Sequence, residues 1–323
     1  MHTGQHYDDE LSAIFVRELD VPRPDVELHL GGGSNTEQTG RMLGALGELL
    51  REAPDAVLVY GDTNSTLAGA LAAAQAQIPV AHVEAGMRSF DRAMPEEINR
   101  VLTDHLAELL LAPSPVAARN LARESVAGEV AVVGDVMVDV ARVLAPRAAA
   151  DDKPLRQAGV SAGEYVLVTA HRAGTVDDPQ RLARLVELLL GLDETIVLPL
   201  HPRTRARLEA AALLASVEAA AIVLPPLGYL AFTSLLTRAR AVLTDSGGVQ
   251  KEAYLAGVPC VTLRDTTEWV ETVQAGWNVL VDLDAGRAAT ALARPAPASR
   301  PKLYGDGHAA DRVVAAITDH LGG

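Results

Sequence analysis

The stretch Ala56–Glu84, AVLVYGDTNSTLAGALAAAQAQIPVAHVE, decides the fold class because it holds a strand, a helix and a second strand in succession. The apolar runs 56–60 and 80–83 have the length of buried strands, and Ser65–Gln77 between them has the length and composition of a helix. A helix in this position joins two parallel strands by a right-handed crossover. The stretch therefore predicts an α/β fold with a parallel sheet.

The same alternation continues along the chain. Further strands are predicted at 109–112, 130–133, 165–169, 195–200, 222–224, 241–244, 259–263 and 278–281. Further helices are predicted at 36–53, 95–108, 179–190, 229–238, 248–256 and 307–321. A chain of 323 residues exceeds one ordinary core and fits two such domains. We place the boundary in the stretch Arg142–Pro154, which predicts domains at residues 1–145 and 146–306 and a last helix at 307–323 that packs back across the junction.

Composition excludes several classes of partner. The 28 basic and 42 acidic residues give a net charge of −14, whereas nucleic-acid binding requires a basic surface. All apolar runs are shorter than the roughly 20 residues of a membrane span, and residues 1–20 lack the apolar segment of a signal peptide. The single cysteine, Cys260, cannot form an intramolecular disulfide. We therefore expect a cytoplasmic protein with neither nucleic acid nor membrane as partner.

Polar residues follow the predicted strands at their carboxyl ends, where open parallel sheets bind ligands. Asp62 and Glu84 follow two neighbouring strands, and the proximity of two carboxylates raises one pKa and suits acid–base chemistry. A turn residue is the alternative for Asp62. His171 is placed for proton transfer or a phosphate contact, and His201 suits binding or a turn. His82 lies inside a strand and is expected in the core.

The turn Ser246-Gly247-Gly248 opens a predicted helix. Its N–H groups and the helix dipole suit a phosphate, and Glu252 in the second turn would then face a ribose. An ordinary strand-to-helix turn is the alternative interpretation. No Cys/His spacing resembles a metal site, and the run Gly31–Gly33 lacks the dinucleotide-binding pattern.

Pro95 predicts the start of a helix whose first turn contains Glu96 and Glu97. Acids there complement the helix dipole, and Glu96 is spaced to pair with Arg100, so the residues alone favour a structural role for Glu96. The apolar periodicity predicts a buried face made of Ile98, Val101, Leu102, His105, Leu106 and Leu109.

Six strings, in this order and spread over nearly the whole chain, carry a resemblance to a known family. They are TGQHYD at 3–8, YGDTNSTLAGALAA at 60–73, HVEAGMRSFDRAMPEEINR at 82–100, TAHR at 169–172, TDSGGVQKEA at 244–253 and RDTTEW at 264–269. With them the chain resembles the non-hydrolysing UDP-N-acetylglucosamine 2-epimerases. The resemblance implies two Rossmann-like doubly wound domains around a central cleft, the GT-B arrangement, apparently without the first βα unit of the N-terminal domain.

The resemblance also implies a reaction and a set of site residues. The reaction is the reversible inversion at C2 of a UDP-linked 2-acetamido sugar, by elimination and re-addition of UDP. The implied catalytic residues are Asp62, Glu84, Glu96 and His171. The expected substrate-binding residues are Arg88, Arg100, Arg172, His201, Phe232, Ser246, Gly247, Gly248 and Glu252. Neither a cofactor nor a metal is implied, and a UDP-sugar and a second copy in a homodimer are the expected partners.

Three departures from the family pattern shape the alternatives. The family has a strand, a Gly-Thr-Arg-Pro turn and a helix before TGQH, which predicts either a mis-assigned start codon or a truncation. Trp269 stands where many members carry an arginine that contacts UDP. Bacterial members have a regulatory UDP-sugar pocket, whose Gln-His pair is present here as Gln5 and His6, whereas Asp8 and Glu37 stand at the places of its second glutamine and its arginine. Acids there are expected to repel a diphosphate. Besides the leading function, the alternatives are an epimerase of UDP-2,3-diacetamido-glucuronic acid, a hydrolysing 2-epimerase that releases UDP, and a truncated, inactive UDP-sugar-binding protein.

Overall fold

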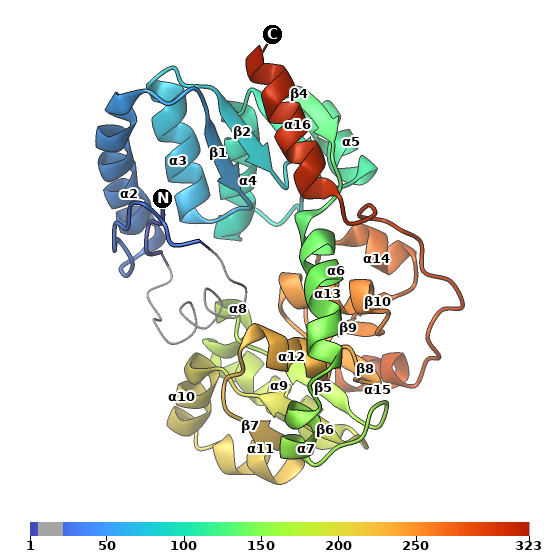
Figure 1. The fold of residues 1–323 in the computed structure, drawn as a ribbon. Coiled ribbons are helices and arrows are strands. Elements are labelled where there is room, and N and C mark those ends of the chain that lie inside the picture. Colours follow the sequence, from blue (N-terminus) through green and yellow to red (C-terminus); the bar gives the residue numbers. More distant parts are fainter. Residues whose placement is uncertain (6–21, 323) are drawn as a thin grey trace. The chain divides into compact units, whose positions relative to one another are not determined.

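The computed structural model describes residues 1–5 and 22–322 of the chain, and these form two compact units (Figure 1). Unit 1 comprises Met1–Val140 and Lys302–Gly323, and unit 2 comprises Ala141–Pro301. The boundary that the sequence predicted at 145/146 falls inside helix α6 (Val136–Ala149). The last helix, α16 (Ala309–Gly322), belongs to unit 1.

Unit 1 is built on a four-stranded parallel sheet in the order β1-β2-β3-β4. Its strands are β1 (Val57–Tyr60), β2 (Val80–Val83), β3 (Leu109–Ala112) and β4 (Glu129–Val132). Its remaining helices are α2 (Asn35–Leu49), η1 (Leu50–Glu52), α3 (Asn64–Gln75), α4 (Pro95–Leu106) and α5 (Pro115–Glu124). Because all connections run through helices, the carboxyl ends of β1 to β4 lie along one edge.

The two faces of this sheet are covered by helices from distant parts of the chain. On one face, Ala81, Val83 and Leu111 form a core cluster with Val313 of α16. On the opposite face Val59 lies close to Gly69 of α3. Since α3 buries mostly alanine and glycine, its backbone can lie close to the sheet and to the neighbouring helices α2 and α4.

The predicted buried face of α4 is wrong. Ile98 and Leu102 are 41% and 45% exposed, and His105 is exposed as well. The buried residues of the helix are instead Glu97, Asn99, Arg100, Thr103 and Asp104. Apolar periodicity assumes that polar side chains stay in water, but four of these five have charged or hydrogen-bonding partners inside the unit that offset the cost of burial.

Unit 2 has a six-stranded parallel sheet in the order β10-β9-β8-β5-β6-β7. The strands are β5 (Val166–Thr169), β6 (Ile196–Pro199), β7 (Ile222–Leu224), β8 (Ala241–Thr244), β9 (Cys260–Thr262) and β10 (Asn278–Leu280). Numbered from β5, this is the 3-2-1-4-5-6 order of Rossmann folds, read from the β7 edge. The winding direction reverses between β5 and β8, and this switch point is where such sheets bind ligands.

Alternate residues of the unit 2 strands face opposite layers of helices. Val166 and Val168 join a core with α9 (Pro179–Gly191), α10 (Pro202–Ala210), α11 (Leu214–Ala220) and α15 (Ala285–Leu292). Tyr165 and Leu167 join a second core with α7 (Lys153–Ala158), α12 (Tyr229–Leu236) and α13 (Gly247–Ala256). Two short helices, α8 (Ala173–Val176) and α14 (Val270–Gln274), complete the unit. Strands buried on both faces explain why the sequence shows them as apolar runs.

Two expectations from the sequence concern burial and membranes. Cys260 is buried in β9, and burial raises the pKa of its thiol to about 12. Within residues 1–5 and 22–322, no helix combines the length and the hydrophobicity that crossing a bilayer requires.

Substitutions of two separate glycines test the packing of unit 1. A Cβ atom on Gly128, just before β4, would lie 2.4 Å from the carbonyl oxygen of Ala107, whereas one on Gly44 of α2 would meet nothing within 4 Å. We expect Gly128→Ala to lower the free energy of unfolding of unit 1 by about 2 kcal/mol or more. Gly44→Ala should raise it by about 0.5–1 kcal/mol, because alanine restricts the unfolded chain. Urea unfolding of both variants measures the difference, and equal values would contradict the observed approach of β4 to Ala107.

Candidate active site

Two carboxylates of unit 1 stand at the carboxyl ends of neighbouring strands. Asp62 follows β1 after Gly61, and Glu84 follows β2 directly; β1 and β2 are paired, with Tyr60 beside Val83. A Cβ atom on Gly61 would lie 3.4 Å from Oε2 of Glu84, so the Glu84 carboxylate lies beside the turn that carries Asp62. Glu84 has φ +69°, a strained conformation for a residue other than glycine and one that concentrates at functional sites.

Asp62 lies in an environment that opposes its charge. Burial raises the pKa of its carboxyl, Arg100 lowers it through an ion pair, and the negative charges of Glu84 and Glu96 raise it, with a net shift upward. Glu84 and Glu96 thus lie within electrostatic reach of Asp62, and the sequence predicted this proximity for Glu84. A raised pKa makes a carboxylate a better proton acceptor, which suits acid–base chemistry.

Two arginines predicted as substrate contacts are engaged inside unit 1. Arg88 is 2% exposed, and its three guanidinium nitrogens contact Glu124, Asp104 and the carbonyl of Met87. Arg100 is equally buried and pairs with Asp62 and Glu97. Both side chains thus have partners inside unit 1, and their contact with substrate stays a prediction.

Glu97, which the sequence did not single out, holds the loop before α4. Its carboxylate accepts hydrogen bonds from the backbone N–H of Ser89 and of Phe90 and from the Ser89 hydroxyl, each at 2.9 Å. It also pairs with Arg100 at 3.2 Å, the partner that the sequence had assigned to Glu96. Glu96 is partly exposed at the first turn of the helix, so its carboxyl stays available to a ligand.

Amide side chains fix the backbone of Asp62. Asn99 of α4 donates to the Asp62 carbonyl at 2.9 Å and to the side-chain oxygen of Asn64 at 3.1 Å, and Asn64 donates in turn to Gln38 at 2.7 Å. A cavity of about 420 Å³ adjoins Asn64 and Asn99 between the first turns of α2, α3 and α4. Sequence reasoning missed these amides, because their partners lie far away along the chain.

The regulatory positions implied by the family resemblance are only partly within the described residues. His6 and Asp8 lie outside them. The side-chain oxygen of Gln5 accepts hydrogen bonds from the N–H and hydroxyl of Ser65, at 2.9 and 2.8 Å. Glu37 forms a capping box with Ser34, and these hydrogen bonds lower the pKa of its carboxyl. A negative charge at Glu37 is consistent with the expected repulsion of a diphosphate there.

In unit 2 the residues after β5 and β8 meet at the switch point. Asp245 follows β8 and is completely buried, and its carboxylate accepts the backbone N–H groups of His171 at 3.1 Å and Arg172 at 3.0 Å. The His171 ring stacks on the ring of His201, with 5.4 Å between centroids. The structure therefore places His171, Arg172 and His201 close together around Asp245, which the sequence did not single out as a site residue.

The turn Ser246-Gly247-Gly248 begins helix α13. Ser246 caps the helix, its hydroxyl accepting from the N–H of Val249 at 3.5 Å, which is the ordinary turn role weighed from the sequence. A Cβ on Gly247 would lie 2.1 Å from Oε1 of Glu268, so a larger residue there would displace the Glu268 carboxylate. Gly248 is exposed with only the Ser246 hydroxyl nearby, which leaves room for a ligand at this end of the helix.

Glu252 and Tyr229 form a polar pair beside this turn. Burial raises the pKa of the Glu252 carboxyl to about 7, against the lowering effects of Lys251 and of a hydrogen bond with Tyr229. The Tyr229 pKa is also raised, by burial first and then by the charge of Glu252. Phe232, expected near the uracil, lies on the same helix, α12, and packs partly against the core.

Trp269, at the position where the family resemblance leads us to expect an arginine, contacts Lys251. Both side chains are buried, and the Lys251 ammonium lies 4.3 Å from the centroid of the Trp269 ring, a cation–π contact. The tryptophan that stands at the expected arginine position thus holds a lysine from α13. The ring also lies against the phosphate-type turn, since a Cβ on Gly247 would be 3.5 Å from its Nε1.

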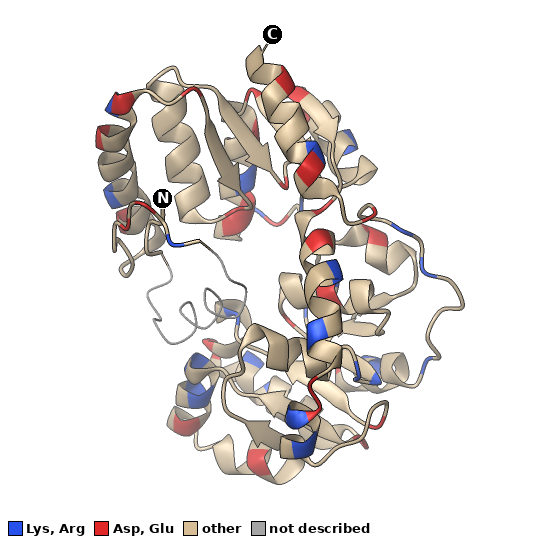
Figure 2. Cartoon of the chain, viewed as in Figure 1, with Lys and Arg blue, Asp and Glu red and all other residues tan. Residues whose placement is uncertain are grey.

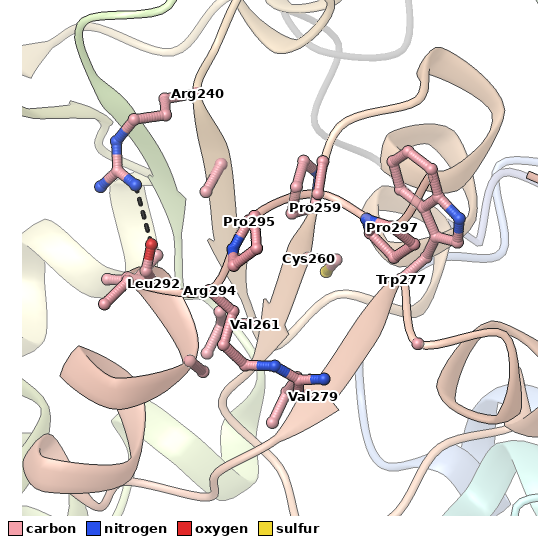
Figure 3. Close-up of a pocket in the computed structure, with 15 residues that line it drawn as sticks. Arg240, Pro259, Cys260, Val261, Trp277, Val279, Leu292, Arg294, Pro295 and Pro297 are labelled. Atoms are coloured by element: carbon pink, nitrogen blue, oxygen red, sulfur yellow. Dashed lines mark hydrogen bonds between the residues drawn. The ribbon is translucent and has the colours of Figure 1, made fainter. Parts of the chain in front are cut away.

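Unit 2 has a cavity of about 360 Å³ at the amino ends of its strands, the edge of the sheet opposite to the candidate ligand-binding residues. Its lining includes Arg240, Pro259 and Trp277, which lie at the amino ends of β8, β9 and β10 (Figure 3). The guanidinium of Arg240 is engaged there by the Leu292 carbonyl at 2.8 Å. His171 and Ser246 follow the opposite, carboxyl ends of the strands.

Two further observations concern the distribution of charge and the geometry of possible metal ligands. Acidic and basic residues are interspersed on the helices of both units, without a continuous basic face in this view (Figure 2). Among the residues that the structure describes, no cluster of three His, Cys, Asp or Glu side chains has the geometry of a metal site.

Comparison with known proteins identifies the family. A sequence profile described as UDP-N-acetylglucosamine 2-epimerase matches residues 1–318. A "UDP-N-acetylglucosamine 2-epimerase homolog" of Methanococcus maripaludis is 46% identical, over 97% of this chain and 90% of that protein. The UDP-2,3-diacetamido-2,3-dideoxy-D-glucuronate 2-epimerase of Pseudomonas aeruginosa is 47% identical, over 97% of this chain and 89% of that protein.

A solved structure agrees with the sequence relatives. The crystal structure of Methanocaldococcus jannaschii UDP-GlcNAc 2-epimerase in complex with UDP-GlcNAc and UDP has a TM-score of 0.91 and 41% identity, and the match covers 99% of this chain and 91% of that one. Two Rossmann-like units in one chain define the GT-B class of α/β proteins, as predicted. Within that class the chain belongs to the UDP-N-acetylglucosamine 2-epimerase family.

Glu252 predicts a pH dependence of nucleotide binding. An ionised carboxylate accepts ribose hydroxyl groups better than a protonated one, and burial has raised the Glu252 pKa to about 7. We therefore expect UDP affinity to rise about tenfold from about pH 6 to about pH 8 as Glu252 loses its proton. Calorimetry on the wild type and on Glu252→Gln measures this, because the variant retains the titration of UDP itself. An identical pH dependence in both proteins would remove Glu252 from the nucleotide site.

Proposed function

We propose that this chain catalyses the reversible C2 epimerisation of a UDP-linked 2-acetamido sugar without net hydrolysis, interconverting sugars of the UDP-GlcNAc and UDP-ManNAc type. The observation that carries the proposal is Asp62, a strand-end carboxyl with a raised pKa beside Glu84, in a chain of this epimerase family. Inversion at C2 needs a group that removes the C2 proton on one face and a group that supplies one on the other. Acids with raised pKa values can serve in either direction.

Each unit supplies one part of the proposed chemistry. In unit 1, Asp62, Glu84 and Glu96 exchange the C2 proton while UDP leaves, which gives an unsaturated sugar, and UDP is added back after reprotonation. In unit 2, the turn of Ser246, Gly247 and Gly248 holds the diphosphate and Glu252 the ribose, with Phe232 near the uracil. His171, Arg172 and His201 sit at the switch point, where a histidine and an arginine can stabilise the charge on departing UDP.

The identity of the sugar is a choice between two substrates. UDP-GlcNAc is the bound ligand in the M. jannaschii structure, and UDP-2,3-diacetamido-glucuronate is named for the P. aeruginosa relative at 47% identity. We favour UDP-GlcNAc as the substrate, with the diacetamido sugar as the second candidate. Comparing kcat/KM for both sugars decides between them. Accumulation of free UDP in step with product would indicate the hydrolysing alternative, and binding of UDP without turnover of either sugar would indicate an inactive binding protein.

The central test removes the proton-transfer group and keeps its shape. We expect Asp62→Asn to lower kcat by roughly 10²–10⁴-fold, together with the incorporation of solvent deuterium at C2, because an amide cannot exchange the proton. Affinity for UDP should stay close to that of the wild type, since the nucleotide contacts are assigned to unit 2. The matched control is Asp55→Asn, an exposed aspartate of the same unit. Retention of more than about a tenth of wild-type activity in Asp62→Asn would exclude Asp62 from the catalytic set.

We further propose that the protein is cytoplasmic and forms a homodimer. The observation in favour of a second copy is the outward apolar face of α4, where Ile98 and Leu102 are exposed while the polar face is buried. A symmetric contact between two copies would bury these side chains.

Introducing a charged residue on α4 tests the proposed dimer. We expect Leu102→Glu to convert the dimer to a monomer in sedimentation equilibrium, because a buried carboxylate without a partner is costly. Leu190→Glu, an equally apolar and exposed site on α9 of unit 2, should remain dimeric. A wild-type chain that sediments as a monomer contradicts the dimer, and a dimeric Leu102→Glu contradicts its placement on α4.

A further inference from the structure

His82 is completely buried in β2 and has two acceptors as partners. Its Nδ1 lies 2.7 Å from Oδ1 of Asp104, and its Nε2 lies 2.8 Å from the carbonyl oxygen of Gly61. A carbonyl oxygen can only accept. The second oxygen of Asp104 receives N–H groups of Gly86 at 3.0 Å and Arg88 at 2.7 Å. Nε2 of His82 is therefore the donor to Gly61, and one proton joins Nδ1 to Asp104.

His82 and Asp104 begin a chain of polar and charged side chains. Asp104 joins His82 to Arg88, and Arg88 binds Glu124 with Nε at 2.8 Å and a second nitrogen at 2.7 Å. Since Asp104 and Arg88 are both buried, each depends on its neighbour for hydrogen bonds, and removing either would leave a buried polar group without its partner.

This charged chain contacts the turns that carry both candidate acids. Gly61, whose carbonyl His82 binds, directly precedes Asp62. Gly86, whose N–H Asp104 binds, lies in the turn that Glu84 begins. All of Gly61, Glu84 and Gly86 have positive φ, at +63°, +69° and +81°. A backbone in this conformation persists only where surrounding contacts enforce it.

We propose that His82 and Asp104 are positioning residues for the epimerisation and form a clamp: His82 holds the Gly61 carbonyl from β2, Asp104 holds the Gly86 N–H from α4, and these two contacts fix the separation of Asp62 and Glu84. This inference rests on the proposed function for its kinetic consequence. The clamp acts through the backbone and touches no substrate, so its loss should lower kcat much more than it raises KM.

Two substitutions of one side chain separate the two contacts. The amide nitrogen of glutamine at position 82 falls near the place of Nε2, so His82→Gln can still donate to Gly61. The amide nitrogen of asparagine falls near the place of Nδ1, so His82→Asn can donate only to Asp104. We expect His82→Asn to lower kcat roughly 10–100-fold with KM changed less than about threefold, and His82→Gln to restore most of this loss.

Glu124→Gln is the matched control, because it disturbs the far end of the same charged chain and leaves both turn contacts in place. Its kcat should stay within about twofold of the wild type. Equal loss of kcat in all three variants would show a general effect of the network on stability and overturn the clamp. Equal loss of kcat in His82→Asn and His82→Gln, with Glu124→Gln unaffected, would also overturn it, because the Gly61 contact would then make no difference to kcat.

Two measurements do not depend on activity, and the second needs no variant. If the wild type epimerises neither sugar, the proposed function fails, and amide hydrogen exchange still tests the clamp: the segment around Gly61 should exchange faster in His82→Asn than in His82→Gln. If His82→Asn does not fold, ¹⁵N spectra of histidine-labelled wild-type protein decide. A proton on Nε2 of His82 supports the clamp, and an unprotonated Nε2 overturns it, because the Gly61 carbonyl can only accept.

Discussion

The burial of the Asp104 carboxyl group is the constraint on which unit 1 depends. A carboxyl group in a protein core is stable only if hydrogen-bond partners replace the water that it has lost, and Asp104 has three: the His82 ring, the Gly86 N–H and the Arg88 guanidinium. To provide them, α4 must turn its polar face toward the sheet, and its apolar side chains Ile98 and Leu102 are left outside. The orientation of one helix and the geometry of two turns thus follow from one buried carboxyl group.

Unit 2 also has a buried aspartate that binds the turns at the carboxyl ends of its strands. Asp245 is buried after β8 and accepts the backbone N–H groups of His171 and Arg172 after β5. In both units a buried aspartate ties together the turns that follow two strands, and the exposed side chains of those turns are the ones available to a ligand. Parallel sheets place such turns side by side, but the turns have no ladder of their own, so side chains must supply their hydrogen bonds.

The sequence predicted the sheets far better than the polar interior. The ten strands among the described residues lie within one residue of their predicted ends, because strands buried on both faces appear as short apolar runs. The strand-end positions of Asp62, Glu84 and His171 follow from the same pattern. The buried face of α4 could not be predicted, since Glu97 and Asp104 become core residues only through partners elsewhere in the chain. For the same reason the sequence did not show that Arg88 and Arg100 have anionic partners inside unit 1.

Burial raises the pKa of one acid in each unit, and the consequence differs with the proposed task. For Asp62, which is to give and take a proton, a raised pKa reduces the cost of changing its protonation state near neutral pH. For Glu252, which is to accept hydroxyl hydrogens, burial works against the ionised form that binds. A bound ribose would replace with its hydroxyl groups the solvation that the fold has removed, and so favour the carboxylate. Lys251, held under the Trp269 ring, lowers the pKa of the same carboxyl before any ligand arrives. The lysine and the ribose therefore act in the same direction, and both favour the ionised carboxylate that accepts the ribose hydroxyl groups.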